Sequence, residues 1–103
     1  MAREIVNDRW GNEIYLTDER WAHILETHDE MMNYRPQVLM TVRAGQRRQD
    51  RFDPTKYKYS KRFRDLPEGF THLVVVVKFA WREELEEELP NNFILTAYQV
   101  SRR

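Results

Sequence analysis

Two short segments near opposite ends of this chain carry side chains that could do acid–base chemistry. The first contains His23 and His28, and the second contains Thr96 and Tyr98 at alternating positions. Between them lies a stretch rich in Arg, Lys and Tyr. Imidazole can act as acid or base near neutrality because its unperturbed pKa is about 6.5, and a guanidinium can hold a phosphate through two parallel hydrogen bonds. Imidazole, hydroxyl, phenol and guanidinium are the groups needed to cleave RNA without a metal.

A structural role competes with catalysis for the two histidines. On a helix, which turns by about 100° per residue, His28 lies within about 20° of Trp21 on the apolar face, and His23 lies roughly 160° away. We therefore expect His28 to be largely buried and structural, so that His28→Ala costs about 1–3 kcal/mol of stability. His23→Ala should leave the melting temperature nearly unchanged and remove any cleavage. If the helix packs on two sides, these roles reverse.

The sequence offers little for a metal ion or a nucleotide cofactor. The five-residue spacing of the histidines is not the i, i+4 arrangement that places two imidazoles on one metal, and the chain has no cysteine. Only three glycines occur, and none forms a glycine-rich phosphate loop. We expect no metal and no cofactor. The lack of cysteine also fits a cytoplasmic location.

The composition predicts one folded domain, residues 1–103, with charge divided unevenly along it. Of the 103 residues, 41% are hydrophobic, which allows a single modest core. No apolar run approaches the roughly 20 residues of a membrane span, so no membrane partner is expected. The formal net charge is zero, yet residues 43–64 hold nine basic and two acidic side chains, a balance of +7. Such a segment favours a brief, local contact with a phosphate backbone over tight nonspecific binding.

The first half of the chain predicts a hairpin followed by two helices. Residues 4–16 have the pattern of a β-hairpin with Gly and Asn at its turn. A helix is expected over 18–28, with Thr17 as its N-cap. A second helix is expected over 36–44, with Gly45 as its stop.

The second half of the chain has the alternation of β-strands. Strands are expected over 47–52, 57–64, 73–79 and 92–101. Residues 73–79 are nearly all valine, which is typical of a central strand buried on both faces. Strand 57–64 alternates Tyr with Lys and Arg, a pattern found more often in half-buried sheet packing than in a binding surface. The acidic segment 83–89 should be a solvated turn or a short helix. Helices followed by an antiparallel sheet give an α+β fold.

Several of these segments together resemble a family of small phage and bacterial proteins of the barnase–EndoU–colicin–RelE-like nuclease class. The resemblance covers residues 5–102 and is carried by 11–24, 28–31, the Tyr- and Arg-rich strand and the final Thr-Ala-Tyr. One departure is Asp29, where the family usually has Pro. The resemblance implies an N-terminal hairpin and two helices packed on one side of a twisted antiparallel sheet of about four strands, with the active site on the other side.

The resemblance also implies a toxin-like, metal-independent endoribonuclease, held by a partner such as an antitoxin or immunity protein. The family's helix histidines match His23 and His28, its final-strand motif matches Thr96 and Tyr98, and its basic strand residue matches Arg62 or Arg64. We expect His23 to be the acid or base, Arg62 a phosphate clamp, Tyr98 a positioning or proton-donating group and Thr96 an orienting hydroxyl. The residues expected to bind the RNA are Arg51, Lys58, Tyr59 and Arg64.

A noncatalytic module with the same fold, binding a protein or an RNA, is the alternative. Its support is the neutral net charge and the acidic segment 83–89, which could mask the basic face or dock a partner.

Overall fold

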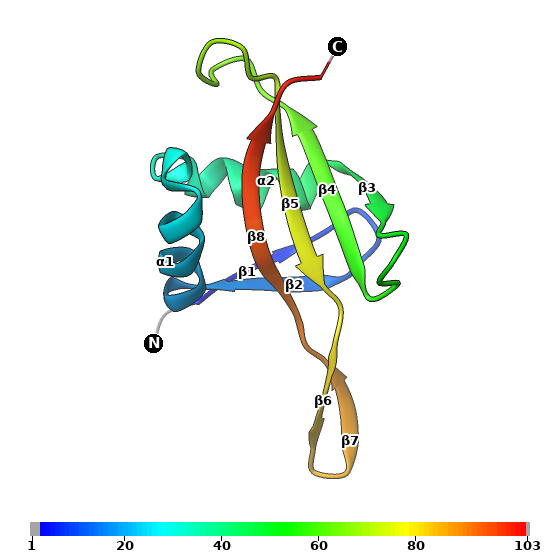
Figure 1. Cartoon of the computed structure of the whole chain (residues 1–103). Helices are drawn as coiled ribbons and strands as arrows, with labels where there is room; N and C mark the ends of the chain where they lie inside the picture. Colours follow the sequence, from blue (N-terminus) through cyan, green and yellow to red (C-terminus); the bar gives the residue numbers. More distant parts are fainter. Residues whose placement is uncertain (1–2, 103) are drawn as a thin grey trace.

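The computed structural model describes residues 3–102 and shows an α+β fold with two α-helices and a mostly antiparallel main sheet (Figure 1). The elements are β1 (Arg3–Asn7), β2 (Glu13–Thr17), α1 (Asp18–Thr27), the 3₁₀ helix η1 (Asp29–Met31), α2 (Arg35–Ala44), β3 (Gln46–Gln49), β4 (Lys56–Arg62), β5 (His72–Lys78), β6 (Trp81–Glu84), β7 (Glu87–Pro90) and β8 (Asn92–Val100). The main sheet has six strands in the order β1-β2-β8-β5-β4-β3, and β6 and β7 form a separate ribbon.

The expectation of about four strands was therefore too low. The N-terminal hairpin joins the main sheet, because β2 pairs in parallel with β8 at Ile14↔Asn92 and Tyr15↔Phe93. The acidic segment forms strands where a turn or short helix was expected. It is the far end of one long hairpin, in which the pairing of β5 with β8 continues into β6 and β7 (Figure 1). Leu85 and Glu86 make its two-residue turn with positive φ angles of 51° and 64°.

The two helices begin and end near the positions expected from their caps. The Thr17 hydroxyl accepts a hydrogen bond from the Arg20 backbone N–H at 3.0 Å, which satisfies one of the free donors at the start of α1. The helix α2 ends at Gly45, whose N–H donates to the Thr41 carbonyl at 2.9 Å. A Cβ at this position would collide with the carbonyl oxygens of Thr41 and Ser60, so only glycine allows α2 to end against β4.

One face of the central strands carries the hydrophobic core, and the other lies open. The helices and the β1–β2 hairpin lie on the same side of β8, β5 and β4 (Figure 1). The core on that side includes Leu73, Val75, Val77, Tyr59, Ala97 and Ile94 from the sheet and Val6, Leu16, Trp21, Ile24, Val38 and Val42 from the covering elements. Val74 and Val76 point to the opposite face and are also buried, which confirms the expected burial of both faces of this strand. No described helix or strand covers that face (Figure 1).

Within residues 3–102, no helix is both long enough and apolar enough to cross a membrane.

Candidate active site

The open face of the sheet, opposite the helices, presents side chains of β8, β5, β4 and β3 in three rows. The Cα register places Val100, His72 and Arg62 in the first row, Tyr98, Val74, Ser60 and Gln46 in the second, and Thr96, Val76, Lys58 and Arg48 in the third. Neighbouring strands lie about 4.8 Å apart, so the rows run across a shared surface. Four of the predicted site residues are thereby brought to one face: Arg62, Thr96, Tyr98 and Lys58.

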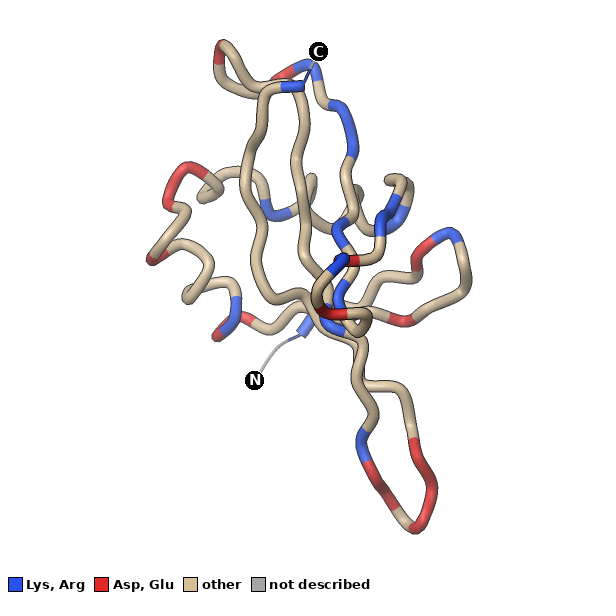
Figure 2. Tube along the Cα trace, turned by 45° about the vertical axis from the view of Figure 1, so that its right-hand side comes forward, with Lys and Arg blue, Asp and Glu red and all other residues tan. Residues whose placement is uncertain are grey.

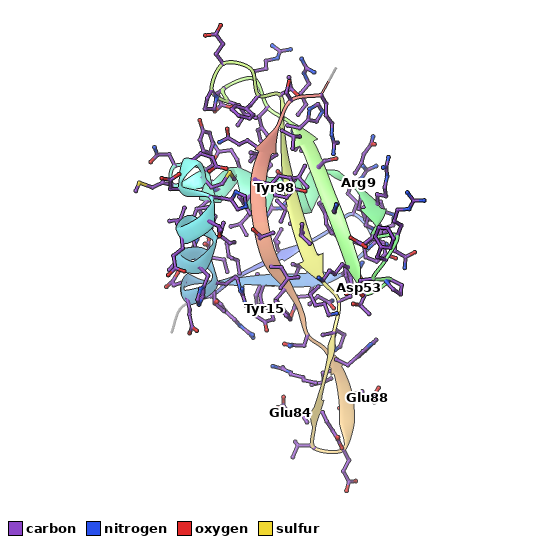
Figure 3. All side chains as sticks on the ribbon, viewed as in Figure 1. Arg9, Tyr15, Asp53, Glu84, Glu88 and Tyr98 are labelled. Carbon is purple, nitrogen blue, oxygen red and sulfur yellow. The ribbon has the colours of Figure 1, made fainter. Side chains whose placement is uncertain are left out.

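Two adjoining hollows beside β3 and β4 are lined by basic residues. The larger, of about 350 Å³, is lined by Arg9, Lys61, Arg62, His72 and Arg102 together with Gln46, Ser60, Ala44 and Gly45. It lies at the edge of β4 beyond the start of β3, where the open face meets the β1–β2 turn and the end of α2. The smaller, of about 170 Å³, is lined by Arg47, Arg48 and Lys58, with Ser60, Gln46 and Arg102 shared between the two. Neither is lined by a described Asp or Glu. Figure 2 shows Lys and Arg gathered on this part of the molecule and a group of acidic residues on the β6–β7 ribbon, and Figure 3 shows Arg9 beside β3 and β4.

Most basic residues that line these hollows form no ion pair, whereas several other basic residues of the chain do. Arg35 pairs with Glu4 and Asp18, Arg47 with Asp8, Lys56 and Lys78 with Asp53, and Arg82 with Glu84. Among residues 3–102, no acidic partner pairs with the remaining lining cations, Arg9, Arg48, Lys58, Lys61, Arg62 and Arg102. Like charges gathered in this way repel one another. An anionic ligand would relieve that repulsion.

His72 stands at the edge of the larger hollow and is held by Thr71. Its Nδ1 lies 2.7 Å from the Thr71 hydroxyl oxygen. That oxygen also accepts a hydrogen bond from the backbone N–H of Arg102 at 2.8 Å and donates one to the backbone carbonyl of Arg102 at 3.2 Å. All these groups are satisfied together when Nδ1 carries the proton and donates to Thr71, an assignment by hydrogen-bond logic. The Nε2 lone pair of His72 is then free.

Burial lowers the pKa of His72, and the positive charges of Arg102 and Arg62 lower it further. His72 is therefore neutral at pH 7. Arg102 also reaches over β5, because its Nη1 donates to the Ser60 hydroxyl on β4 at 3.0 Å. A neutral imidazole with a free nitrogen lies in a hollow rich in guanidinium groups, an arrangement suited to taking a proton beside a bound phosphate.

The structure brings His28, and not His23, to the predicted tyrosine. The His28 and Tyr98 rings lie 5.7 Å apart at 32°, and His28 Nδ1 is 3.3 Å from a Glu30 carboxylate oxygen. The His28 side chain is 33% exposed, so the prediction that it is largely buried was wrong. His28 is the C-cap of α1, with φ −131° and ψ 64°, so the helical turn angle used to place it no longer applies. His23 points elsewhere as expected, with its side chain 56% exposed beside Glu26.

The other three residues predicted to bind RNA do not line either hollow: Tyr59, Arg51 and Arg64. Tyr59 is fully buried, and its hydroxyl donates to Asp8, so its ring cannot stack on a base in this structure. Arg51 lies in the β3–β4 turn with its guanidinium 5.8 Å from the Phe52 ring centre.

The sequence analysis missed His72, Arg102, Arg48, Arg9 and Ser60. His72 starts the valine strand and shares its outward face with Val74 and Val76. Pairing strand 57–64 with that strand would have placed it opposite Arg62. Arg102 and Arg9 reach the hollow from segments distant in the chain, so no local pattern indicated them.

The two helix histidines give a prediction that differs from the one based on helix geometry. We now expect His28→Ala to lower RNA cleavage at least tenfold, because it removes a group beside Tyr98, and His23→Ala to leave it within about twofold. His28→Ala should cost about 0.5–1.5 kcal/mol, the usual worth of an aromatic contact. Cleavage assays and thermal melts of both variants measure these effects. An inactive His23→Ala beside an active His28→Ala would contradict this assignment.

No family model, curated protein or solved structure matches the chain. Within residues 3–102, no group of three or more His, Asp or Glu side chains is placed to hold a metal ion.

Proposed function

We propose that this protein is a metal-independent endoribonuclease that cleaves RNA through its 2′-hydroxyl. The observation that carries the proposal is the larger hollow, where His72 has a free Nε2 and the surrounding cations have no acidic partner among the described residues. A toxin-like role, an antitoxin or immunity protein as partner and a cytoplasmic location belong to the same proposal. The toxin-like role and the partner derive from the family resemblance alone, and the cytoplasmic location from the lack of cysteine.

The open face offers a group for each step of the reaction. His72 Nε2 takes the 2′-hydroxyl proton, and the resulting oxygen attacks the adjacent phosphorus. Arg62 and Arg102 neutralise the charge that grows on the phosphorane oxygens. The bond from phosphorus to the 5′-oxygen breaks as that oxygen receives a proton, leaving a 2′,3′-cyclic phosphate and a 5′-hydroxyl.

We assign to His28 the donation of the proton to the leaving group. Tyr98 lies diagonally across from His72 in the β5–β8 register, a position about 7–8 Å away on paired strands. His28 is the C-cap of α1 and contacts the Tyr98 ring. The helix α1 lies on the side of β8 away from β5 (Figure 1). A phosphate held at the His72 side of the larger hollow, next to Tyr98, would therefore have His72 on one side and His28 beyond Tyr98 on the other. Tyr98 would position the substrate, and the hydroxyl of Thr96, one row along β8, would orient it.

Cleavage in the presence of EDTA tests this function. We expect the purified chain to cut single-stranded RNA at an undiminished rate in excess EDTA, because no step uses a metal. Mass spectrometry should identify 2′,3′-cyclic phosphate ends. A His72→Ala preparation purified in parallel controls for contaminating nucleases. A requirement for a divalent metal, or intact RNA across several sequences, would refute the proposal.

The noncatalytic binding module stays as the second candidate, and the β6–β7 ribbon favours it. The ribbon projects from the body (Figures 1 and 3), and its exposed residues include Glu83, Glu84, Glu86, Glu87 and Glu88. A projecting acidic arm suits docking of a basic partner. RNA binding without cleavage in the same assay would support this candidate.

A further inference from the structure

The smaller hollow adjoins the larger one along β4 and, like it, is lined by basic residues and by no described Asp or Glu. Along β4, Lys58 in the smaller hollow and Arg62 in the larger are four residues apart, or about 13 Å in an extended strand. Ser60 lies between them and is hydrogen-bonded to Arg102, which lines both hollows. Because Gln46, Ser60 and Arg102 line both hollows, the two are joined. Anions bound on either side of Ser60 would therefore lie closer together than the backbones of Lys58 and Arg62, and neighbouring phosphates of a strand could occupy both hollows.

Arg48 and Lys58 form an unusual pair across β3 and β4. They are direct cross-strand partners on the open face, where side chains lie about 5 Å apart and like charges destabilise the sheet. Within residues 3–102, neither is paired with an acidic group. An anion bound between the Arg48 and Lys58 side chains would offset their repulsion.

The geometry points to two anion subsites that hold consecutive phosphates of one RNA strand. The larger hollow, with Arg62, Arg102 and His72, holds the phosphate to be cleaved. Arg48 and Lys58 hold the phosphate next to it along the strand. This inference rests on the proposed function for the identity of the cleaved phosphate, whereas binding of a second phosphate can be tested without any cleavage.

Binding of short oligonucleotides that cannot be cleaved tests the second subsite. The probes are fluorescent 2′-O-methyl dinucleotides with one internucleotide phosphate, alone or with an added 5′- or 3′-terminal phosphate. We expect one of the two added phosphates to lower Kd by roughly tenfold, as a charge-assisted contact does. The slope of log K against log salt should steepen by about 0.7, the value for one further phosphate on a single strand.

The double variant Arg48→Gln/Lys58→Gln should lose both the gain in affinity and the steeper slope, each measured against the affinity of the same variant for the one-phosphate probe. Arg20→Gln/Arg43→Gln removes the same charge outside both hollows and should keep the gain. No gain in the unmutated protein, or a gain that survives in Arg48→Gln/Lys58→Gln, overturns the second subsite. A normal gain in a protein that never cleaves RNA leaves the subsite standing and refutes the endoribonuclease.

Discussion

Replacement of His72 by Ala should lower kcat/KM for RNA cleavage by about 10²- to 10⁴-fold, the usual contribution of a general base. The side chain sits where a bound phosphate would be held by Arg62 and Arg102, and its Nε2 is free because Nδ1 is held by Thr71. The substitution removes no core residue, so the thermal melt should change little. Single-turnover cleavage assays measure the loss.

The pH profile separates a general base from a residue that only binds. Burial and the charges of Arg102 and Arg62 lower the pKa of His72, so kcat/KM should rise with pH through a value below 6.5, the ordinary pKa of histidine. Arg102→Gln removes one of these charges and should move this rise to higher pH, toward 6.5, besides lowering the rate. An unshifted rise in Arg102→Gln, or a His72→Ala that keeps full activity, would rule out His72 as the base.

Local patterns predicted the elements whose causes lie within a few residues. The N-cap at Thr17, the stop at Gly45 and the valine strand all follow from neighbouring positions, and the structure confirms each of them. The β6–β7 ribbon was missed because glutamate-rich sequence favours helix locally. Its strand form follows from the pairing of β5 with β8, which joins residues far apart in the chain.

The position of a site residue was predictable only where that residue lies on a strand whose alternation is visible in the sequence. Lys58, Arg62, Thr96 and Tyr98 share the open face because each lies on a strand whose period was visible in the sequence. His28 was misplaced because it caps α1 and leaves the helical geometry. Arg9 and Arg102 come to the hollow through tertiary contacts, which no single-sequence pattern reports.

Replacement of Asp8 by Ala should destabilise the fold by about 3–5 kcal/mol, the cost of removing one member of a buried charged pair. The Asp8 side chain is fully buried beside Arg47, whose Nη1 lies 3.6 Å from its carboxylate. It accepts hydrogen bonds from the backbone N–H groups of Trp10 and Asn12, both at 2.9 Å, and from the Tyr59 hydroxyl. Without Asp8, the buried Tyr59 phenol loses its acceptor and the mostly buried Arg47 guanidinium loses its anion. Urea denaturation measures the change, and Asp65→Asn in an exposed loop should stay within about 0.5 kcal/mol.

Lowering the pH should reduce the contribution that the Asp8 charge makes to the free energy of unfolding. Burial raises its pKa, but the hydrogen bonds from Tyr59, Asn12 and Trp10 outweigh burial and hold the pKa below the usual 3.8. A lowered folded-state pKa adds stability that is present above about pH 4 and is lost as the pH falls through the folded value. The stability gap between the unmutated protein and Asp8→Asn should therefore narrow below pH 4. A gap that stays constant down to pH 2 would mean that the charge of Asp8 contributes nothing.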